Sequence, residues 1–317
     1  MSQKWTQLDI PDLTGKVVVI TGANSGLGFE SARTLASKGA TIVMAVRTSA
    51  KGEQARAAIL KAYPNAVIEV MRLDMGDLSS VRAFADAFVA KYERLDILLN
   101  NAGLMAIPRQ ETVDGFEMQL GVNHLGHFAL TGRLIDVLVK TPKARIHNVS
   151  SSANFTGRIN FDDLMGKRNY GRWEAYGQSK LANIFFTFEL QKRLSAAGFD
   201  TITNTSHPGL VMGNLQENSV AQSGTQLEAL LYRVIQPILA QDIGMGVLPM
   251  LYGMTAPDAK GGVFYGPETF NIRGYPAEQK ANKAAYDAAA LTRFWEVSEQ
   301  LTGVRYAVLE KVATTEL

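Results

Sequence analysis

The stretch Val17-Val18-Val19-Ile20-Thr21-Gly22-Ala23-Asn24-Ser25-Gly26-Leu27-Gly28 decides the fold of this chain. It begins with a run of β-branched residues, typical of a strand covered on both faces, and helical periodicity follows its glycines. Gly22 permits a tight turn, Gly26 lets a ligand approach the backbone, and Gly28 lets helix and strand pack closely. An ordinary glycine-rich turn would need neither flanking element. We therefore expect a helix N-terminus that can hold a pyrophosphate.

The same alternation of short apolar runs and helical periodicity continues to residue 206. It predicts six parallel strands at residues 17–21, 41–46, 67–72, 97–100, 145–150 and 199–205. Crossover helices are expected at residues 26–38, 51–62, 79–92, 116–139 and 176–197. The fold class is α/β: a single-domain Rossmann fold, a doubly wound parallel sheet with helices on both faces.

The alternation of strand and helix patterns ends after Pro208. Residues 209–241 have no clear strand and are interpreted as a mobile substrate lid. A helix at 243–254, a strand at 263–265 and an amphipathic helix near 277–301 follow. Residues 262–317 form a C-terminal extension that we expect to close the substrate pocket together with the lid. All of these belong to one domain, residues 1–317.

Composition narrows the function. The 317 residues are 46% hydrophobic and 20% charged, with a net charge of +2, so no strong field points to a nucleic-acid partner. The chain contains no cysteine, which excludes a disulfide framework and a thiolate nucleophile. Residues 1–10 are polar and the longest apolar runs are too short to span a bilayer. We expect a cytoplasmic protein without a membrane span, acting on a small molecule, and leave open a homo-oligomer.

The end of the second strand bears on the choice of dinucleotide. In a Rossmann fold, an acid about 20 residues beyond the glycine loop reads the ribose of NAD, and a base accommodates the 2′-phosphate of NADP. Here Arg47 and Thr48 stand at that position, and no acid does. A guanidinium binds phosphate in a bidentate manner. NADP (NADPH) is the expected cofactor and NAD the second choice. The alternative interpretation of Arg47 is a solvent-exposed residue at a strand end with no role in cofactor binding.

A tyrosine and a lysine are spaced for chemistry. Tyr176 and Lys180 lie one helical turn apart. A phenol titrates near about 10, so it needs a nearby cation to work at neutral pH. Ser150, Ser151 and Ser152 end a preceding strand, at the sheet edge where ligands bind in such folds. Alone, a tyrosine and lysine at this spacing are more often an exposed helix pair.

These motifs occur in one order along the chain with Asp74, Asn100-Asn101-Ala102-Gly103, Asn123 and Pro208-Gly209. The whole set resembles the short-chain dehydrogenase/reductase family over about residues 14 to 215. The resemblance implies a catalytic tetrad of Asn123, Ser151, Tyr176 and Lys180. Ser151 would bind the substrate oxygen, Tyr176 would exchange its proton, and Lys180 would bind the nicotinamide ribose and lower the tyrosine pKa. Asn123, interrupting a helix, would hold a water. The implied cofactor contacts are Gly22, Asn24, Ser25, Gly26, Leu27, Gly28, Arg47, Thr48, Asp74, Met75, Asn101, Ala102, Gly103, Tyr176, Lys180, Pro208, Gly209 and Val211.

Within the family, residues 176–183 and 207–211 look most like the retinol-dehydrogenase-like and WW-domain-oxidoreductase-like branch, which implies an apolar or bulky carbonyl or alcohol substrate. One departure is Gly213, where the family often has Thr. The resemblance therefore implies that a hydrogen bond to the cofactor carboxamide is either missing or supplied by Asn214. The similar protochlorophyllide oxidoreductases use an active-site cysteine that this chain lacks. The implied activity is hydride transfer between NADP(H) and a carbonyl or alcohol.

Other functions are weighed on the same residues. His124 and His127 are one turn apart, but without a nearby acid they favour packing over a metal site, and no metal is expected. No Gly-x-Ser-x-Gly elbow supports a hydrolase. A non-catalytic NADP-binding sensor or scaffold is the main alternative. Such a protein has no need of the four tetrad residues together.

Overall fold

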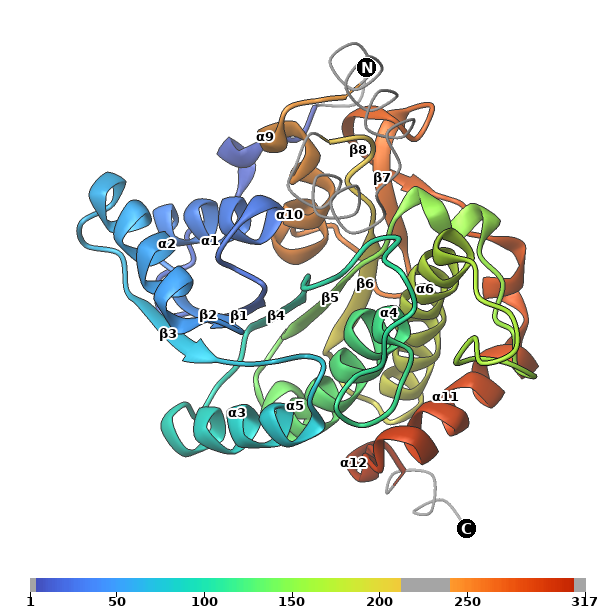
Figure 1. Ribbon diagram of the computed structural model, residues 1–317. Helices are drawn as coiled ribbons and strands as arrows, with labels where there is room; N and C mark the ends of the chain where they lie inside the picture. Colours follow the sequence, from blue (N-terminus) through green and yellow to red (C-terminus); the bar gives the residue numbers. More distant parts are fainter. Residues whose placement is uncertain (1–3, 212–239, 311–317) are drawn as a thin grey trace.

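A central sheet with helices on both faces forms the protein (Figure 1). The computed structural model describes residues 4–211 and 240–310. In these residues the sheet has eight strands in the order β3-β2-β1-β4-β5-β6-β7-β8. They are β1 (Val17–Thr21), β2 (Thr41–Val46), β3 (Ile68–Arg72), β4 (Ile97–Asn100), β5 (Arg145–Val149), β6 (Ile202–Ser206), β7 (Phe264–Thr269) and β8 (Arg273–Gln279). The expected α/β Rossmann fold is confirmed.

The helices divide between the two faces of the sheet. They are η1 (Gln7–Asp9), α1 (Gly26–Ser37), α2 (Ser49–Ala62), α3 (Leu78–Lys91), α4 (Met118–Leu120), η2 (Gly121–Leu125), α5 (Gly126–Lys140), η3 (Ser152–Thr156), α6 (Arg172–Ala196), α9 (Ile243–Gly246), α10 (Leu248–Thr255), η4 (Lys283–Tyr286), α11 (Ala288–Thr302) and α12 (Ala307–Glu310). Side chains of α3, α5, α6 and α11 form one core. Those of α1, α2 and α10 form the other.

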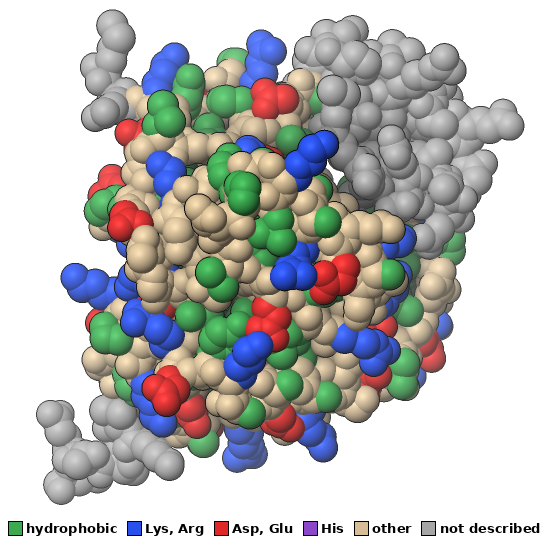
Figure 2. Space-filling model, turned by 90° about the vertical axis from the view of Figure 1, so that its left-hand side faces the viewer, with side chains coloured by type: hydrophobic (Ala, Val, Ile, Leu, Met, Phe, Trp, Pro, Cys, Tyr) green, Lys and Arg blue, Asp and Glu red, His purple; other side chains and the backbone are tan. Residues whose placement is uncertain are grey.

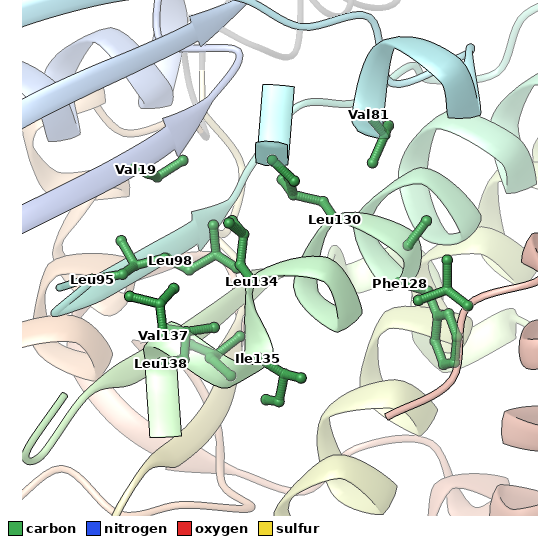
Figure 3. Close-up of a cluster of buried hydrophobic side chains, with 14 of the residues drawn as sticks. Val19, Val81, Leu95, Leu98, Phe128, Leu130, Leu134, Ile135, Val137 and Leu138 are labelled. Atoms are coloured by element: carbon green, nitrogen blue, oxygen red, sulfur yellow. The ribbon is translucent and has the colours of Figure 1, made fainter. Parts of the chain in front are cut away.

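Alternate residues of β1 enter the two cores. Val17 and Val19 join the core beneath α3, α5 and α6, whereas Val18 and Ile20 join the core beneath α1, α2 and α10. This follows from the two-residue period of a strand, and it explains why β1 is apolar throughout. Figure 3 shows Val19 facing the side chains of α5, where Leu134 and neighbouring apolar residues fill the space under the sheet.

One edge of the sheet differs from the expectation of an all-parallel sheet. β1 to β7 pair in parallel, but β8 runs antiparallel to β7. The end of β8 falls where we expected the C-terminal helix to start, and α11 begins only at Ala288. Gly274 and Pro276 interrupt any periodicity in β8, and pairing with β7 makes this segment a strand. β6 also begins later than expected, because a turn at Gly198 (φ 74°) precedes it.

Two expected helices are each divided. The helix expected over 116–139 consists of α4, the π-helix η2 and α5 in direct succession. The helix expected over 243–254 is split at Val247 into α9 and α10, with a proline in the first turn of α10. The expected lid, residues 209–241, lies largely outside the described residues, as do Gly213 and Asn214.

The strand order reverses between β1 and β4, because β2 and β3 lie on one side of β1 and later strands lie on the other. In open α/β sheets, ligands bind at the carboxyl ends of the strands beside such a switch point. The face in Figure 2 carries interspersed acidic and basic side chains, without a large area of one sign. Among the described residues, no helix has the length and hydropathy needed to cross a bilayer.

Candidate active site

A cavity of about 810 Å³ lies at the carboxyl ends of the strands, beside the switch point. Nearly all of the residues expected to bind cofactor or substrate line it: Gly22, Asn24, Ser25, Gly26, Leu27, Arg47, Thr48, Asp74, Met75, Asn101, Ala102, Gly103, Ser151, Tyr176, Lys180, Pro208, Gly209 and Val211. Gly28 and Asn123 are not in the lining. Both lie directly behind it. One cavity therefore unites the glycine turn with the expected catalytic side chains.

The glycine turn has the geometry that a dinucleotide loop requires. Gly22 and Gly26 have φ angles of 68° and 56°, in the left-handed region that favours glycine. A Cβ on Gly28 would lie 2.5 Å from both the Gly22 carbonyl oxygen and Asn101 Nδ2. Asn101 in turn donates from Nδ2 to the Thr21 carbonyl, at 2.8 Å. Gly28 therefore serves packing between the turn and the end of β4, which keeps the cradle compact.

The end of β2 presents positive charge to the cavity. Arg47 is exposed there, and Thr48 is the N-cap of α2 without a side-chain capping bond. Lys51, which the sequence reasoning missed, also lines the cavity from the first turn of α2. Two cations and a helix N-terminus form a favourable environment for a phosphate. The signal for Lys51 was its place four residues beyond Arg47, at the start of the expected helix.

Lys180 is buried close to Tyr176. Its Nζ donates to the Val149 carbonyl at 3.2 Å and lies 5.7 Å from the centre of the Tyr176 ring. Burial lowers the pKa of Lys180 to about 8. Its side chain therefore still carries a positive charge at neutral pH, in a place where water screens it little. That charge favours ionisation of a nearby phenol.

The three serines after β5 have separate environments. The Ser150 hydroxyl is buried and donates to the Lys180 carbonyl at 2.8 Å, so it ties β5 to α6. Ser151 caps η3, where its Oγ accepts from the Ala153 amide at 3.2 Å, and it lines the cavity. Ser152 is exposed and also lines the cavity. Ser151 and Ser152 both present a hydroxyl to the cavity, so the choice of Ser151 stays a prediction.

Asn123 sits in the π-helix η2 and is fully buried. Its Oδ1 accepts from the Leu104 amide at 2.7 Å, and its Nδ2 donates to the Leu104 carbonyl and to Ser179 Oγ, both at 2.9 Å. The side chain thus holds the segment after β4 against α6. A Cβ on Gly103 would lie 3.1 Å from Asn123 Oδ1 and 3.4 Å from Lys180 Nζ, so this backbone must pass close to both.

The remaining wall of the cavity is largely apolar. It includes Leu104, Met105, Met118, Val122, Ala153, Trp173, Leu210 and Ile243, none of which the sequence reasoning singled out. They come from six separate segments, so only the fold brings them together. No described residue of the extension beyond residue 262 lines the cavity, and the expectation that it closes the pocket together with the lid stays a prediction. The extension supports the rim, where the Leu210 amide donates to the Ile272 carbonyl.

The paired histidines take part in internal hydrogen bonds. His124 Nε2 lies 2.9 Å from Ser298 Oγ, and His127 Nε2 lies 2.9 Å from Thr21 Oγ1. Burial lowers their pKa values to about 3 and about 4, so both rings are neutral. Within residues 4–211 and 240–310, no cluster of three histidine or acidic side chains could hold a metal ion.

Comparisons with known proteins match this architecture. Residues 16–224 match the short chain dehydrogenase family. The chain is 40% identical over 301 residues to retinol dehydrogenase 12 of Mus musculus, covering 95% of this chain and 90% of the relative. It is 48% identical over 227 residues to the Homo sapiens protein of that name, covering 72% and 69%. The chain therefore belongs to the short-chain dehydrogenase/reductase family and is an oxidoreductase.

Solved structures agree. A crystal structure of an uncharacterized protein from Mycobacterium paratuberculosis is 41% identical, with a TM-score of 0.78, covering 96% of this chain and 99% of that one. A short chain dehydrogenase from Shigella flexneri, solved in complex with NADP, is 22% identical with a TM-score of 0.61, covering 80% and 97%. The second likeness concerns the fold alone. The resemblance to the retinol-dehydrogenase-like branch is confirmed.

Proposed function

We propose that this protein transfers hydride between NADP(H) and an apolar or bulky carbonyl or alcohol. The observation that carries the proposal is the convergence of Ser151, Tyr176 and Lys180 on one cavity that also contains the glycine turn and Arg47. A protein that only bound the dinucleotide would need the glycine turn and Arg47, but it would not need Ser151, Tyr176 and Lys180 together. Bound nicotinamide would supply or accept the hydride.

The preference for NADP rests on the charges at the end of β2. Arg47 and Lys51 line the cavity beside the N-terminus of α2, and residues 45–50 contain no acid that would repel a 2′-phosphate. The left-handed turn at Gly22 and the tight packing at Gly28 leave the backbone open to a pyrophosphate. Asp74 and Met75 would border the adenine, and residues 101–103 its ribose.

Ser151, Tyr176 and Lys180 in the cavity, and Asn123 behind it, each have a role in the proposed proton movement. Ser151 Oγ would donate to the substrate oxygen and so fix its position. Tyr176 Oη would give that oxygen a proton in reduction and remove it in oxidation. The buried charge of Lys180 stabilises the phenolate form and would bind the nicotinamide ribose. Asn123 fixes Leu104 next to this group, and we propose that it also supports a water leading to Lys180.

The apolar side chains that line the cavity beside these groups indicate the substrate. Met105, Met118, Val122 and Trp173 offer apolar surface and no charge to a bound molecule. Such a wall stabilises a hydrophobic substituent by roughly 25 cal/mol for each Å² removed from water. The curated relatives are named retinol dehydrogenases, which is consistent with an alcohol or aldehyde on an apolar group.

A panel of aldehydes, ketones and alcohols tests the proposal. The purified protein is mixed with NADPH or NADP, and turnover is followed at the NADPH absorbance band. We expect the bulky, apolar compounds to be the better substrates, and NADPH to be preferred over NADH. Cofactor binding without turnover of any compound would overturn the proposal and favour a sensor or scaffold.

A further inference from the structure

Residues 104–107 form a short wall between β4 and the substrate side of the cavity. Leu104 and Met105 line the cavity, and Ala106 follows with a φ of 47°. An alanine in this left-handed region is strained, because its Cβ lies close to the following carbonyl oxygen. Such strain persists only where surrounding contacts determine the conformation. The contacts that hold Ala106 are therefore of interest.

Gln119 in α4 supplies one of these contacts and is completely buried. Its Oε1 accepts from the Ala106 amide at 2.7 Å. Its Nε2 donates to Tyr170 Oη at 2.9 Å and to the Arg172 carbonyl at 3.0 Å. Both amide hydrogens and one oxygen lone pair are thus used. One side chain of α4 therefore joins the segment at residue 106 to the segment at residues 170–172.

The partners of Gln119 also bond one another. Arg172 donates from Nη1 to the Ala106 carbonyl at 3.1 Å. The Tyr170 hydroxyl lies 2.9 Å from the Ile107 carbonyl oxygen and 3.2 Å from Glu117 Oε1, and can donate to one at a time. The wall and the start of α6 are therefore bridged at several points. Gln119 bonds to both directly.

The distance from this bridge to the reacting groups is short. Arg172 is the first residue of α6, and Tyr176 lies one turn further along the same helix. Met105 and Ala106 pack directly against the Tyr176 ring. A change in the spacing between residues 104–107 and the start of α6 would therefore alter the gap in which a substrate meets the Tyr176 hydroxyl.

We propose that Gln119 is a positioning residue that holds the wall at residues 104–107 at a fixed spacing from Tyr176, and thereby sets which bulky carbonyl compounds reach the tyrosine. The proposal rests on the proposed function for its kinetic consequence. Its structural part, the fixed wall, can be measured without turnover. A residue that served only general stability would affect all substrates in equal proportion.

Two substitutions separate the roles. Gln119→Met keeps the length of the side chain and removes all three hydrogen bonds. Gln119→Glu keeps the acceptor for the Ala106 amide but loses amide donors, which places an acidic oxygen against the Arg172 carbonyl. Gln191→Met is the matched control, because Gln191 lies further along α6, where its Oε1 accepts from the Thr203 amide. Gln191 does not line the cavity.

The first measurement is hydrogen exchange of peptides that span residues 103–107. We expect faster exchange in both Gln119 variants and no change there in the Gln191→Met protein. The second is kcat/KM for one bulky and one small carbonyl compound with NADPH. We expect the ratio of bulky to small to fall about tenfold in Gln119→Met, since misplacement of a reacting group by about 1 Å is sufficient for such losses. NADPH affinity should stay at the wild-type value.

Unchanged exchange at residues 103–107 would overturn the proposal, and so would an equal proportional loss of kcat/KM for both compounds. If the wild-type protein turns over no carbonyl compound, the proposed function fails. The exchange measurement then decides separately whether Gln119 holds the wall.

Discussion

The ammonium of Lys180 lies 5.7 Å from the centre of the Tyr176 ring, in a site where the lysine is almost fully buried. Its hydrogen bond to the Val149 carbonyl fixes it at the end of β5. A buried cation beside a phenol changes the proton affinity of both groups, because little water is present to screen the charge. This relationship has consequences for pH dependence and for stability.

The rate of reduction should fall as pH rises through about 8. Burial lowers the pKa of Lys180 to about 8, so above that pH the ammonium loses its proton and no longer stabilises the Tyr176 phenolate. The profile of kcat/KM for NADPH reports groups in the free enzyme. In the Lys180→Arg variant, where the side chain keeps its charge, this alkaline decline should disappear from whatever activity remains. A decline of the same midpoint in both proteins would contradict the assignment to Lys180.

Lys180→Met should be inactive and yet more stable at neutral pH. At pH about 7 the lysine is charged in both states, and the lowered folded pKa means that burying this charge costs a few kcal/mol. Between about 8 and 10.5 the unfolded chain binds a proton that the folded chain has lost, so the free energy of unfolding rises with pH in this window.

Denaturant unfolding near pH about 7 and about 9.5 measures this effect as the difference between wild type and variant. The difference should shrink at the higher pH. If the variant is less stable than wild type at both pH values, the cost of the buried charge is offset elsewhere and the argument is wrong.

Arg47→Asp should weaken NADPH binding by about ten- to a hundredfold and NADH binding much less, because a charge-assisted hydrogen bond to phosphate contributes about 1.5–3 kcal/mol. Lys51→Ala should act in the same direction. Lys61→Ala is a matched control, since Lys61 lies in the last turn of the same helix, away from the cavity. Titration of cofactor fluorescence gives each dissociation constant. Equal losses for the two cofactors would refute a 2′-phosphate site at Arg47.

Gly28→Ala should destabilise the protein more than Gly26→Ala. A Cβ on Gly28 would lie 2.5 Å from the Gly22 carbonyl oxygen. A Cβ on Gly26 would have no atom of the described residues within 4 Å, apart from its chain neighbours and the backbone of its own helix. Gly26→Ala should cost only its backbone strain at φ 56°, on the order of 1–2 kcal/mol. Thermal unfolding without cofactor compares the two. A larger loss for the alanine at position 26 would show that the packing role belongs to the other glycine.

The part of the fold built from local patterns could be predicted from sequence. β1, the glycine turn and α1 follow from a run of residues that are neighbours in the chain. β8 could not be predicted in this way, because Gly274 and Pro276 oppose a strand and only pairing with β7 stabilises it. The antiparallel edge of the sheet is thus a tertiary effect.

In the candidate site, too, the features set by residues close together in the chain were predicted from sequence, and those set by tertiary contacts were not. Sequence motifs predicted the glycine turn for the pyrophosphate and Ser151, Tyr176 and Lys180 for proton transfer. The fold brings these residues to one cavity. Gln119 gave no signal in the sequence, because its three partners come from residues 106, 170 and 172. The apolar residues that line the cavity could not be predicted from the sequence either. Substrate selection depends on contacts between distant segments, which periodicity does not reveal.

Tyr176→Phe tests the central claim most directly. Phenylalanine keeps the ring that packs against Met105 and Ala106 and removes only the hydroxyl. Tyr252→Phe, in α10 on the opposite face of the sheet, controls for the loss of a tyrosine hydroxyl. With the best carbonyl compound of the panel, we predict loss of turnover in Tyr176→Phe with NADPH affinity unchanged, and normal turnover in the control. Wild-type turnover by Tyr176→Phe would contradict the account.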